Sequence, residues 1–64
     1  MIINGKKMDF ELGITVTEVL KRLELPNQTV VVELNLDIVP AEKYNTTTIN
    51  EGDKVEIVKF VGGG

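Results

Sequence analysis

The chain has 64 residues and a net charge of −3, enough for one small domain. It contains no Cys, which excludes a disulfide framework and a cysteine metal site. Its acidic balance argues against nucleic acid as a partner, and the absence of a signal-peptide or membrane-spanning pattern predicts a cytoplasmic protein that does not enter a membrane.

The first segment predicts an antiparallel hairpin. Asn4 and Gly5 form the strongest short hairpin signal, because both residues tolerate a positive φ angle. An apolar run precedes them at residues 1–3, and the stretch from Lys7 to Leu12 alternates between charged and apolar side chains. This alternation is typical of a half-buried strand.

The next segment predicts an amphipathic helix. Thr15 and Glu18 fit a capping box, in which each side chain accepts a hydrogen bond from the other's backbone N–H. The apolar residues that follow repeat every three or four positions and comprise Val16, Val19, Leu20 and Leu23. Glu18 and Arg22 stand one turn apart in the order that favours an ion pair. We expect the helix to end near Leu25, because Pro26 follows.

The second half predicts three strands separated by polar turns. The strands are the β-branched run 29–34, the short run 38–40 and the final run 54–61. Pro40 confines the short strand to an edge or an end of a sheet. Turns are expected at 35–37 and 50–53, and the stretch 41–50 is polar and irregular.

This order predicts an α+β chain with a β-grasp, or ubiquitin-like, fold. A mixed sheet of four to five strands would carry one amphipathic helix on one face. The last strand follows a long excursion and could lie between the outer strands. We expect residues 1–61 to form this domain and residues 62–64 to form a flexible glycine tail.

The residue types argue against an enzyme. The chain has no His, Cys or Ser, so the usual general base and the commonest nucleophiles are missing. Glu51 and Asp53 could suggest a pair of metal ligands, but they flank Gly52 in a predicted turn. We therefore expect no metal site and no cofactor bound by this chain.

The second half of the sequence resembles the ThiS family, small bacterial and archaeal sulfur carriers of thiamin synthesis. The matching pieces stand in order and are the valine strand with Asn35, Ile38-Val39-Pro40, Tyr44, Thr48, Gly52-Asp53, Val55-Glu56-Ile57 and Val61-Gly62-Gly63-Gly64. Asn4-Gly5 and the early helix agree with the family pattern. Leu36 departs from it, because Gly often stands there, and Ala41 replaces a residue that is often basic. Any partner contact made by that basic charge is absent here.

The resemblance implies that the C-terminal carboxylate of Gly64 is the working group. A ubiquitin-activating (E1-like) adenylyltransferase would use ATP to convert it into an acyl-adenylate. Sulfur from a persulfide donor would replace the AMP and leave a thiocarboxylate, and thiazole synthase would take that sulfur. Gly62 and Gly63 would give access to narrow active sites, because they lack a Cβ atom.

Four apolar residues are candidates for a surface that binds these partner enzymes. The alternation of the last strand fails at Val58, so that Val58, Phe60 and Val61 are hard to bury together. Leu36 lies in a predicted turn, where it is expected to be exposed. Exposed apolar side chains of this kind can mark an interaction surface, although each of the four could instead belong to the core.

Three other functions share parts of this pattern. A molybdopterin sulfur carrier would have the same fold, tail and thiocarboxylate. A ubiquitin-like modifier would be joined to lysines through Gly64 after the same first step. A small interaction domain could carry the three glycines as an inert end, although the strand leads into them at the spacing typical of the family.

Overall fold

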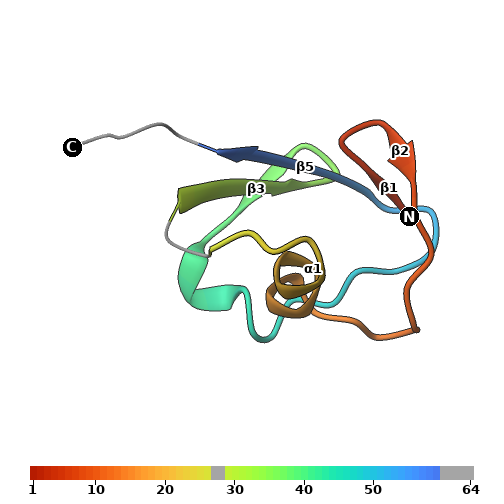
Figure 1. Ribbon diagram of the computed structural model, residues 1–64, viewed down its shortest axis with the longest axis horizontal. Coiled ribbons are helices and arrows are strands. Elements are labelled where there is room, and N and C mark those ends of the chain that lie inside the picture. Colours follow the sequence, from red (N-terminus) through yellow and green to blue (C-terminus); the bar gives the residue numbers. More distant parts are fainter. Residues whose placement is uncertain (27–28, 60–64) are drawn as a thin grey trace.

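The computed structural model describes residues 1–26 and 29–59, which form five strands, one α-helix and a short 3₁₀ helix. In chain order these elements are β1 (Ile2–Ile3), β2 (Lys6–Lys7), α1 (Val16–Arg22), β3 (Val30–Leu34), β4 (Asp37–Val39), the 3₁₀ helix η2 (Ala41–Lys43) and β5 (Lys54–Lys59). Figure 1 shows the sheet lying over the helix in two layers. The predicted β-grasp arrangement of a mixed sheet and one amphipathic helix is confirmed.

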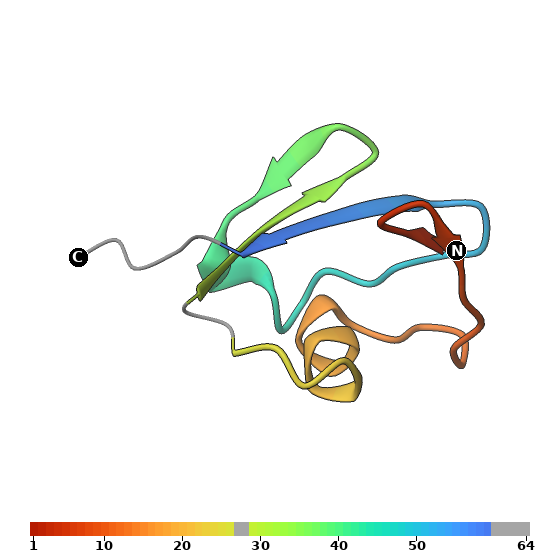
Figure 2. The same cartoon turned by 45° about the horizontal axis from the view of Figure 1, so that its top comes forward.

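The last strand lies in the middle of the sheet. The strand order is β2-β1-β5-β3-β4, so β5 has a hydrogen-bonded neighbour on each side (Figure 2). β5 pairs with β1 in parallel and with β3 in antiparallel orientation, which makes the sheet mixed. The prediction that the final strand lies between outer strands is therefore confirmed, as is the edge position of the strand that precedes Pro40.

The helix begins where the sequence predicts but ends earlier. The capping box between Thr15 and Glu18 is present. The helix ends at Arg22 because Glu24 takes a positive φ of 58°. The backbone N–H groups of Glu24 and Leu25 then donate to Lys21 and Leu20, which closes the last turn as a Schellman motif. Glycine usually occupies that position, so a glutamate there does not indicate this ending.

The helix is short, and its role is to cover the sheet. It has seven residues, and its buried side chains are Val16, Val19 and Leu20. Leu23 is partly buried against the same core. Among the residues that the structure describes, no helix has the length and apolarity needed to cross a membrane.

The prediction of a long second strand is wrong. β2 contains only Lys6–Lys7, and the stretch from Met8 to Leu12 follows it outside the sheet. The reason is that β1 itself has only two residues, so the pairing of the hairpin extends no further than the backbone hydrogen bonds between Met8 and Met1. Met8 still packs partly against the core, whereas Leu12 is 90% exposed.

Arg22 pairs with a different carboxylate from the predicted one. Its Nη2 donates to Glu11 Oε1 at 2.6 Å, while the Glu18 carboxylate accepts from the backbone of Thr15 in the capping box. The Arg22 hydrogen bond lowers the pKa of Glu11. Arg22 also lies over the ring of Phe10, 5.7 Å from its centre. These contacts tie the segment after β2 to the helix in place of a strand pairing.

The core lies between the helix and one face of the sheet. Its buried side chains are Met1, Ile3, Ile14, Val16, Val19, Leu20, Val30, Val32, Val39, Tyr44, Ile49, Val55 and Ile57. Tyr44 anchors the irregular stretch after β4, since its hydroxyl donates to the carbonyl of Val30 at 3.4 Å. Backbone bonds from Val16 to Thr47 and from Ile49 to Ile14 hold the rest of that stretch against the helix.

Candidate functional site at the end of the central strand

The predicted carrier residue lies beyond the part of the chain that the structure describes. Lys59 ends β5 and is the last described residue, so Gly62, Gly63 and Gly64 fall outside it, as do Phe60 and Val61. Their predicted roles remain predictions. What the structure establishes is the strand that leads directly into them.

The two sides of β5 are paired to different lengths. On one side β3 accompanies it along its whole last part, with Val30 opposite Lys59 and Val31 opposite Val58. On the other side β1 reaches only Val55, which lies opposite Ile3. The end of β5 is therefore bound to β3 by a full ladder, while β1 stops four residues earlier.

The side chain of Asn4 continues the pairing where β1 stops. Its Nδ2 donates to the carbonyl of Ile57 at 3.1 Å, and its Oδ1 accepts from the N–H of Ile57 at 2.7 Å. We call this pair of hydrogen bonds the Asn4 clamp. The amide group of Asn presents a donor and an acceptor much as a strand backbone does. The sequence predicted only the turn at Asn4 and gave no sign of this second role.

A related contact holds the other end of β5. The N–H of Lys54 donates to Asn35 Oδ1 at 3.0 Å, and Asn35 Nδ2 donates to Asp53 Oδ1 at 3.0 Å. Asp53 also accepts from the backbone N–H of Asn50 at 2.8 Å. These bonds, first that from Asn50 and then that from Asn35, lower the pKa of Asp53. The predicted turn at 50–53 is thus confirmed, and it uses the Asp53 carboxylate for its own backbone.

The two acidic residues of this turn have different surroundings. Glu51 is exposed, and Asp53 is engaged in the turn. Within residues 1–26 and 29–59, no three His, Cys, Asp or Glu side chains come together as metal ligands would.

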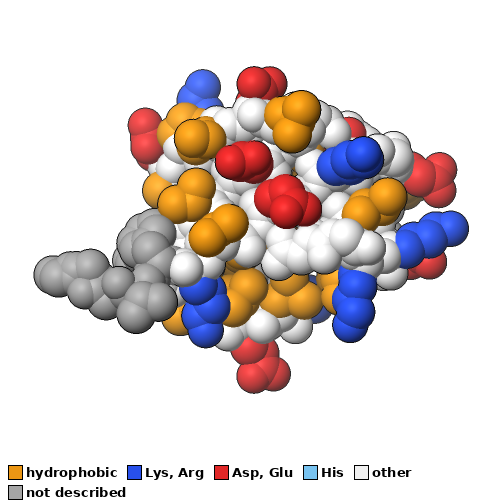
Figure 3. All heavy atoms as spheres, turned by 90° about the horizontal axis from the view of Figure 1, so that it is seen from above, with side chains coloured by type: hydrophobic (Ala, Val, Ile, Leu, Met, Phe, Trp, Pro, Cys, Tyr) orange, Lys and Arg blue, Asp and Glu red, His pale blue; other side chains and the backbone are white. Residues whose placement is uncertain are grey.

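The face of the sheet away from the helix mixes apolar and acidic side chains. Side chains alternate along a strand, so this outer sheet face carries Val31 and Glu33 of β3, Ile38 of β4, and Glu56 and Val58 of β5. Glu33 lies directly opposite Glu56, and Val31 opposite Val58. Figure 3 shows acidic side chains in the middle of this face with hydrophobic ones around them.

The structure separates the two described members of the predicted partner surface. Val58 is 56% exposed and lies one residue before the end of β5. Leu36 is 88% exposed in the turn between β3 and β4. It stands five residues after Val31, the neighbour of Val58, which corresponds to about 16 Å along a strand. Only Val58 is therefore close to the start of the C-terminal segment, residues 60–64.

Sequence reasoning missed Ile38 as an exposed apolar residue. Ile38 is 67% exposed and lies opposite Glu33 on the outer sheet face, while its neighbour Val39 is buried. The alternation of the short strand contained this information, because a buried Val39 requires Ile38 to point the other way.

Leu36 is strained, and this gives a first testable prediction. Its φ of 75° lies in the left-handed region, which costs a residue with a Cβ about 1–2 kcal/mol. Replacing Leu36 with Gly should raise the free energy of unfolding by up to about 1 kcal/mol, because glycine's greater freedom in the unfolded chain offsets part of the relief. Urea denaturation measures the change, and Leu12→Gly, at an exposed position without a positive φ, is the control. A lower unfolding midpoint for Leu36→Gly would contradict the strain.

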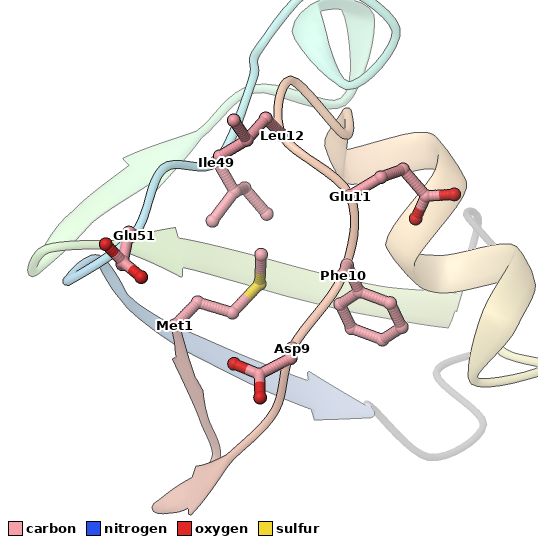
Figure 4. A pocket seen from close by; sticks show the side chains of 7 residues that line it. All are labelled: Met1, Asp9, Phe10, Glu11, Leu12, Ile49 and Glu51. Atoms are coloured by element: carbon pink, nitrogen blue, oxygen red, sulfur yellow. The ribbon is translucent and has the colours of Figure 1, made fainter.

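Two hollows lie at the opposite end of β5 from Lys59. One has a volume of about 40 Å³, and in Figure 4 the side chains of Met1 and Ile49 converge in it beside Phe10. A wider depression of about 390 Å³ adjoins it and is open to solvent, next to Gly52. Both hollows lie near the start of β5, and its six residues span about 17 Å from there to Lys59. Neither is part of the site at the end of the strand.

Comparisons with known proteins agree on one family. A family model described as the ThiS family matches residues 1–64. The sulfur carrier protein ThiS of Bacillus subtilis is 36% identical over 63 residues, which make up 97% of this chain and 96% of that protein. The crystal structure of the thiamine biosynthesis protein ThiS from Geobacter metallireducens superposes with a TM-score of 0.80 and 38% identity, covering 98% of this chain and 96% of that one.

A much longer protein is also similar to the chain. The thiazole synthase of Paramagnetospirillum magneticum is 44% identical over 64 residues, which make up 100% of this chain but 20% of that protein. The chain thus spans a fifth of the length of this relative.

Proposed function

We propose that this chain, which belongs to the ThiS family, is a sulfur carrier protein of thiamin biosynthesis and that the carboxylate of Gly64 is the group that carries the sulfur. One observation supports this assignment above others. The strand that leads to the glycines is the central strand of the sheet, and it is hydrogen-bonded up to Lys59. The chain is therefore held in the sheet until five residues before Gly64.

The proposed chemistry takes place at the main-chain terminus. An E1-like adenylyltransferase transfers AMP from ATP to the carboxylate and releases pyrophosphate. The terminal sulfur of a donor persulfide then attacks the acyl carbon and displaces AMP, which gives an acyl disulfide that joins the chain to the donor. A second thiolate then attacks the donor's sulfur in the S–S bond, forms a disulfide with the donor and releases the thiocarboxylate. This chain supplies the carboxylate and the partners supply the catalytic groups, in the cytoplasm, where ATP is available.

Glycine suits the residues next to a group that must enter several active sites. Gly62, Gly63 and Gly64 have no Cβ that could collide with a narrow channel, and glycine adopts backbone angles closed to other residues. Fixing each residue in a channel costs about 1–2 kcal/mol of backbone entropy. The partner must recover this free energy from contacts with the folded domain.

We assign thiazole synthase as the enzyme that accepts the sulfur. The similarity between this whole chain and part of a protein named thiazole synthase supports that assignment. The E1-like adenylyltransferase and the persulfide donor are required by the chemistry, because a carboxylate is a poor electrophile until it is activated.

The outer sheet face next to the end of β5 is the proposed contact for these partners. Val58 belongs to it, and Phe60, Val61 and Leu36 remain candidates. Val58 is 56% exposed, so it can contact a partner without unfolding of the domain.

Replacing Val58 with Ala tests this contact. We expect at least about a fivefold weaker affinity for the adenylyltransferase, since a residue that matters in an interface contributes more than about 1 kcal/mol. The unfolding midpoint should change little, because the side chain is half exposed. Titration calorimetry measures the affinity, and Leu12→Ala is the control, since Leu12 is exposed and lies outside the sheet. An unchanged affinity would remove Val58 from the interface.

Mass spectrometry of the intact protein tests the proposed carrier residue. The chain is incubated with the adenylyltransferase, ATP and a persulfide donor, and then digested. The mass gain of sulfur replacing oxygen is expected on the peptide that contains Gly64, and thiazole synthase should remove it. A gain on any other peptide would overturn the assignment.

A further inference from the structure

We propose that Asn4 is a positioning residue for sulfur transfer, because its side chain fixes the place where β5 leaves the sheet. This inference rests on the proposed function of Gly64. Asn4 is distant from Ile57 in sequence, but the clamp joins the hairpin turn to the end of the central strand through two hydrogen bonds of 3.1 and 2.7 Å. Both bonds are partly shielded from solvent.

The clamp lies on the side of β5 that would otherwise be unpaired. The β1 backbone gives its last hydrogen bond to β5 from the N–H of Asn4 to the carbonyl of Val55. Two residues further along β5, the Asn4 side chain donates to the carbonyl of Ile57 and accepts from its N–H. Among the described residues, no strand pairs with β5 on this side after Val55. Without the clamp, β5 would be held from Ile57 onward by β3 alone.

A strand end held on one side can separate from the sheet more easily than one held on both. Each residue that becomes free there must be ordered again when a partner binds, and the cost is conformational entropy. The clamp would therefore lower the entropic cost of presenting the C-terminal segment. Once the carboxylate is bound in the active site, the chemistry itself does not involve Asn4.

Two substitutions separate this role from simple stabilisation. Asn4→Gly removes the clamp but keeps the turn, because Asn4 has a φ of 50° that glycine adopts freely. Asn35→Gly is the matched control. Asn35 has a φ of 51° in the other hairpin turn, and its side chain also makes two hydrogen bonds, at the start of the same strand.

The experiment measures steady-state kinetics of thiocarboxylate formation for the three full-length proteins, with the carrier concentration varied. Asn4→Gly should raise the KM for the carrier about tenfold at unchanged kcat, since ordering one more residue shifts an equilibrium by about that factor. Asn35→Gly should change KM less than about twofold, because it loosens β5 at the end far from Gly64.

Amide hydrogen exchange shows independently whether the side-chain hydrogen bonds of Asn4 or of Asn35 were lost. The Ile57 amide should exchange faster in Asn4→Gly, and the Lys54 amide in Asn35→Gly, with the rest of the sheet protected in both. Faster exchange of Ile57 together with a wild-type KM would overturn the inference. Equal rises in KM for the two variants would overturn it as well, since they would reflect stability alone. If the wild-type protein gains no sulfur at Gly64, the proposed function itself fails and the inference fails with it.

Discussion

Deletion of Gly63 and Gly64 is expected to reduce thiocarboxylate formation at least about 100-fold. The shortened chain still ends in a carboxylate, but its reach is reduced by two residues, or about 7 Å. A displacement of about 1 Å at a reacting group already costs about 100-fold in rate, so the remaining carboxylate should not reach the adenylating centre. Intact-mass analysis after reaction with the adenylyltransferase, ATP and a persulfide donor measures the loss.

The same deletion should leave the fold unchanged. The described core ends with Ile57, so removal of the last two residues takes nothing from it. The urea midpoint of the deletion variant should therefore equal that of the intact protein. Thiazole formation at the normal rate by the deletion variant would mean that the glycines are inert and that sulfur is carried elsewhere.

Replacement of Leu20 with Ala is expected to have the largest effect on stability. Leu20 is fully buried, on the face of α1 that covers the sheet. Loss of a buried leucine side chain costs about 2–5 kcal/mol through lost burial and the cavity that remains. A small domain has only about 5 kcal/mol or slightly more to lose, so a large fraction of the variant should be unfolded at physiological temperature.

An exposed leucine provides the matched control. Leu12→Ala removes the same atoms from a side chain that is 90% exposed, and it should change the free energy of unfolding by less than about 0.5 kcal/mol. Circular dichroism during thermal and urea unfolding compares the two variants. If both shift the midpoint equally, α1 does not cover the core in the way described here.

The helix shows how local signals can succeed at one end and fail at the other. Its start could be predicted because the capping box involves only Thr15 and Glu18, which lie within four consecutive residues. Its end depends on Glu24 adopting a positive φ, which packing imposes against the local preference of a residue with a Cβ. Pro26 pointed to an ending, but three residues too late.

The prediction of a long second strand is wrong for a related reason. The alternation from Lys7 to Leu12 is typical of a strand, yet a strand needs a neighbour along its whole length. β1 has only two residues, and the last backbone hydrogen bonds of the hairpin join Met8 and Met1. Alternation reports which side chains could face a core, as Met8 does, but it cannot report whether a partner strand is there.

The amino-acid sequence by itself determined the class of fold, the family and the chemical proposal centred on Gly64. The fold class follows from local patterns, whereas the Gly64 proposal is what the resemblance to the ThiS family implies. Only the tertiary structure showed that Asn4 clamps Ile57 and that Leu36 lies far from Val58. The physical reason is that contacts between residues distant in sequence depend on strand register, and register is set by the packing of the whole sheet on its helix.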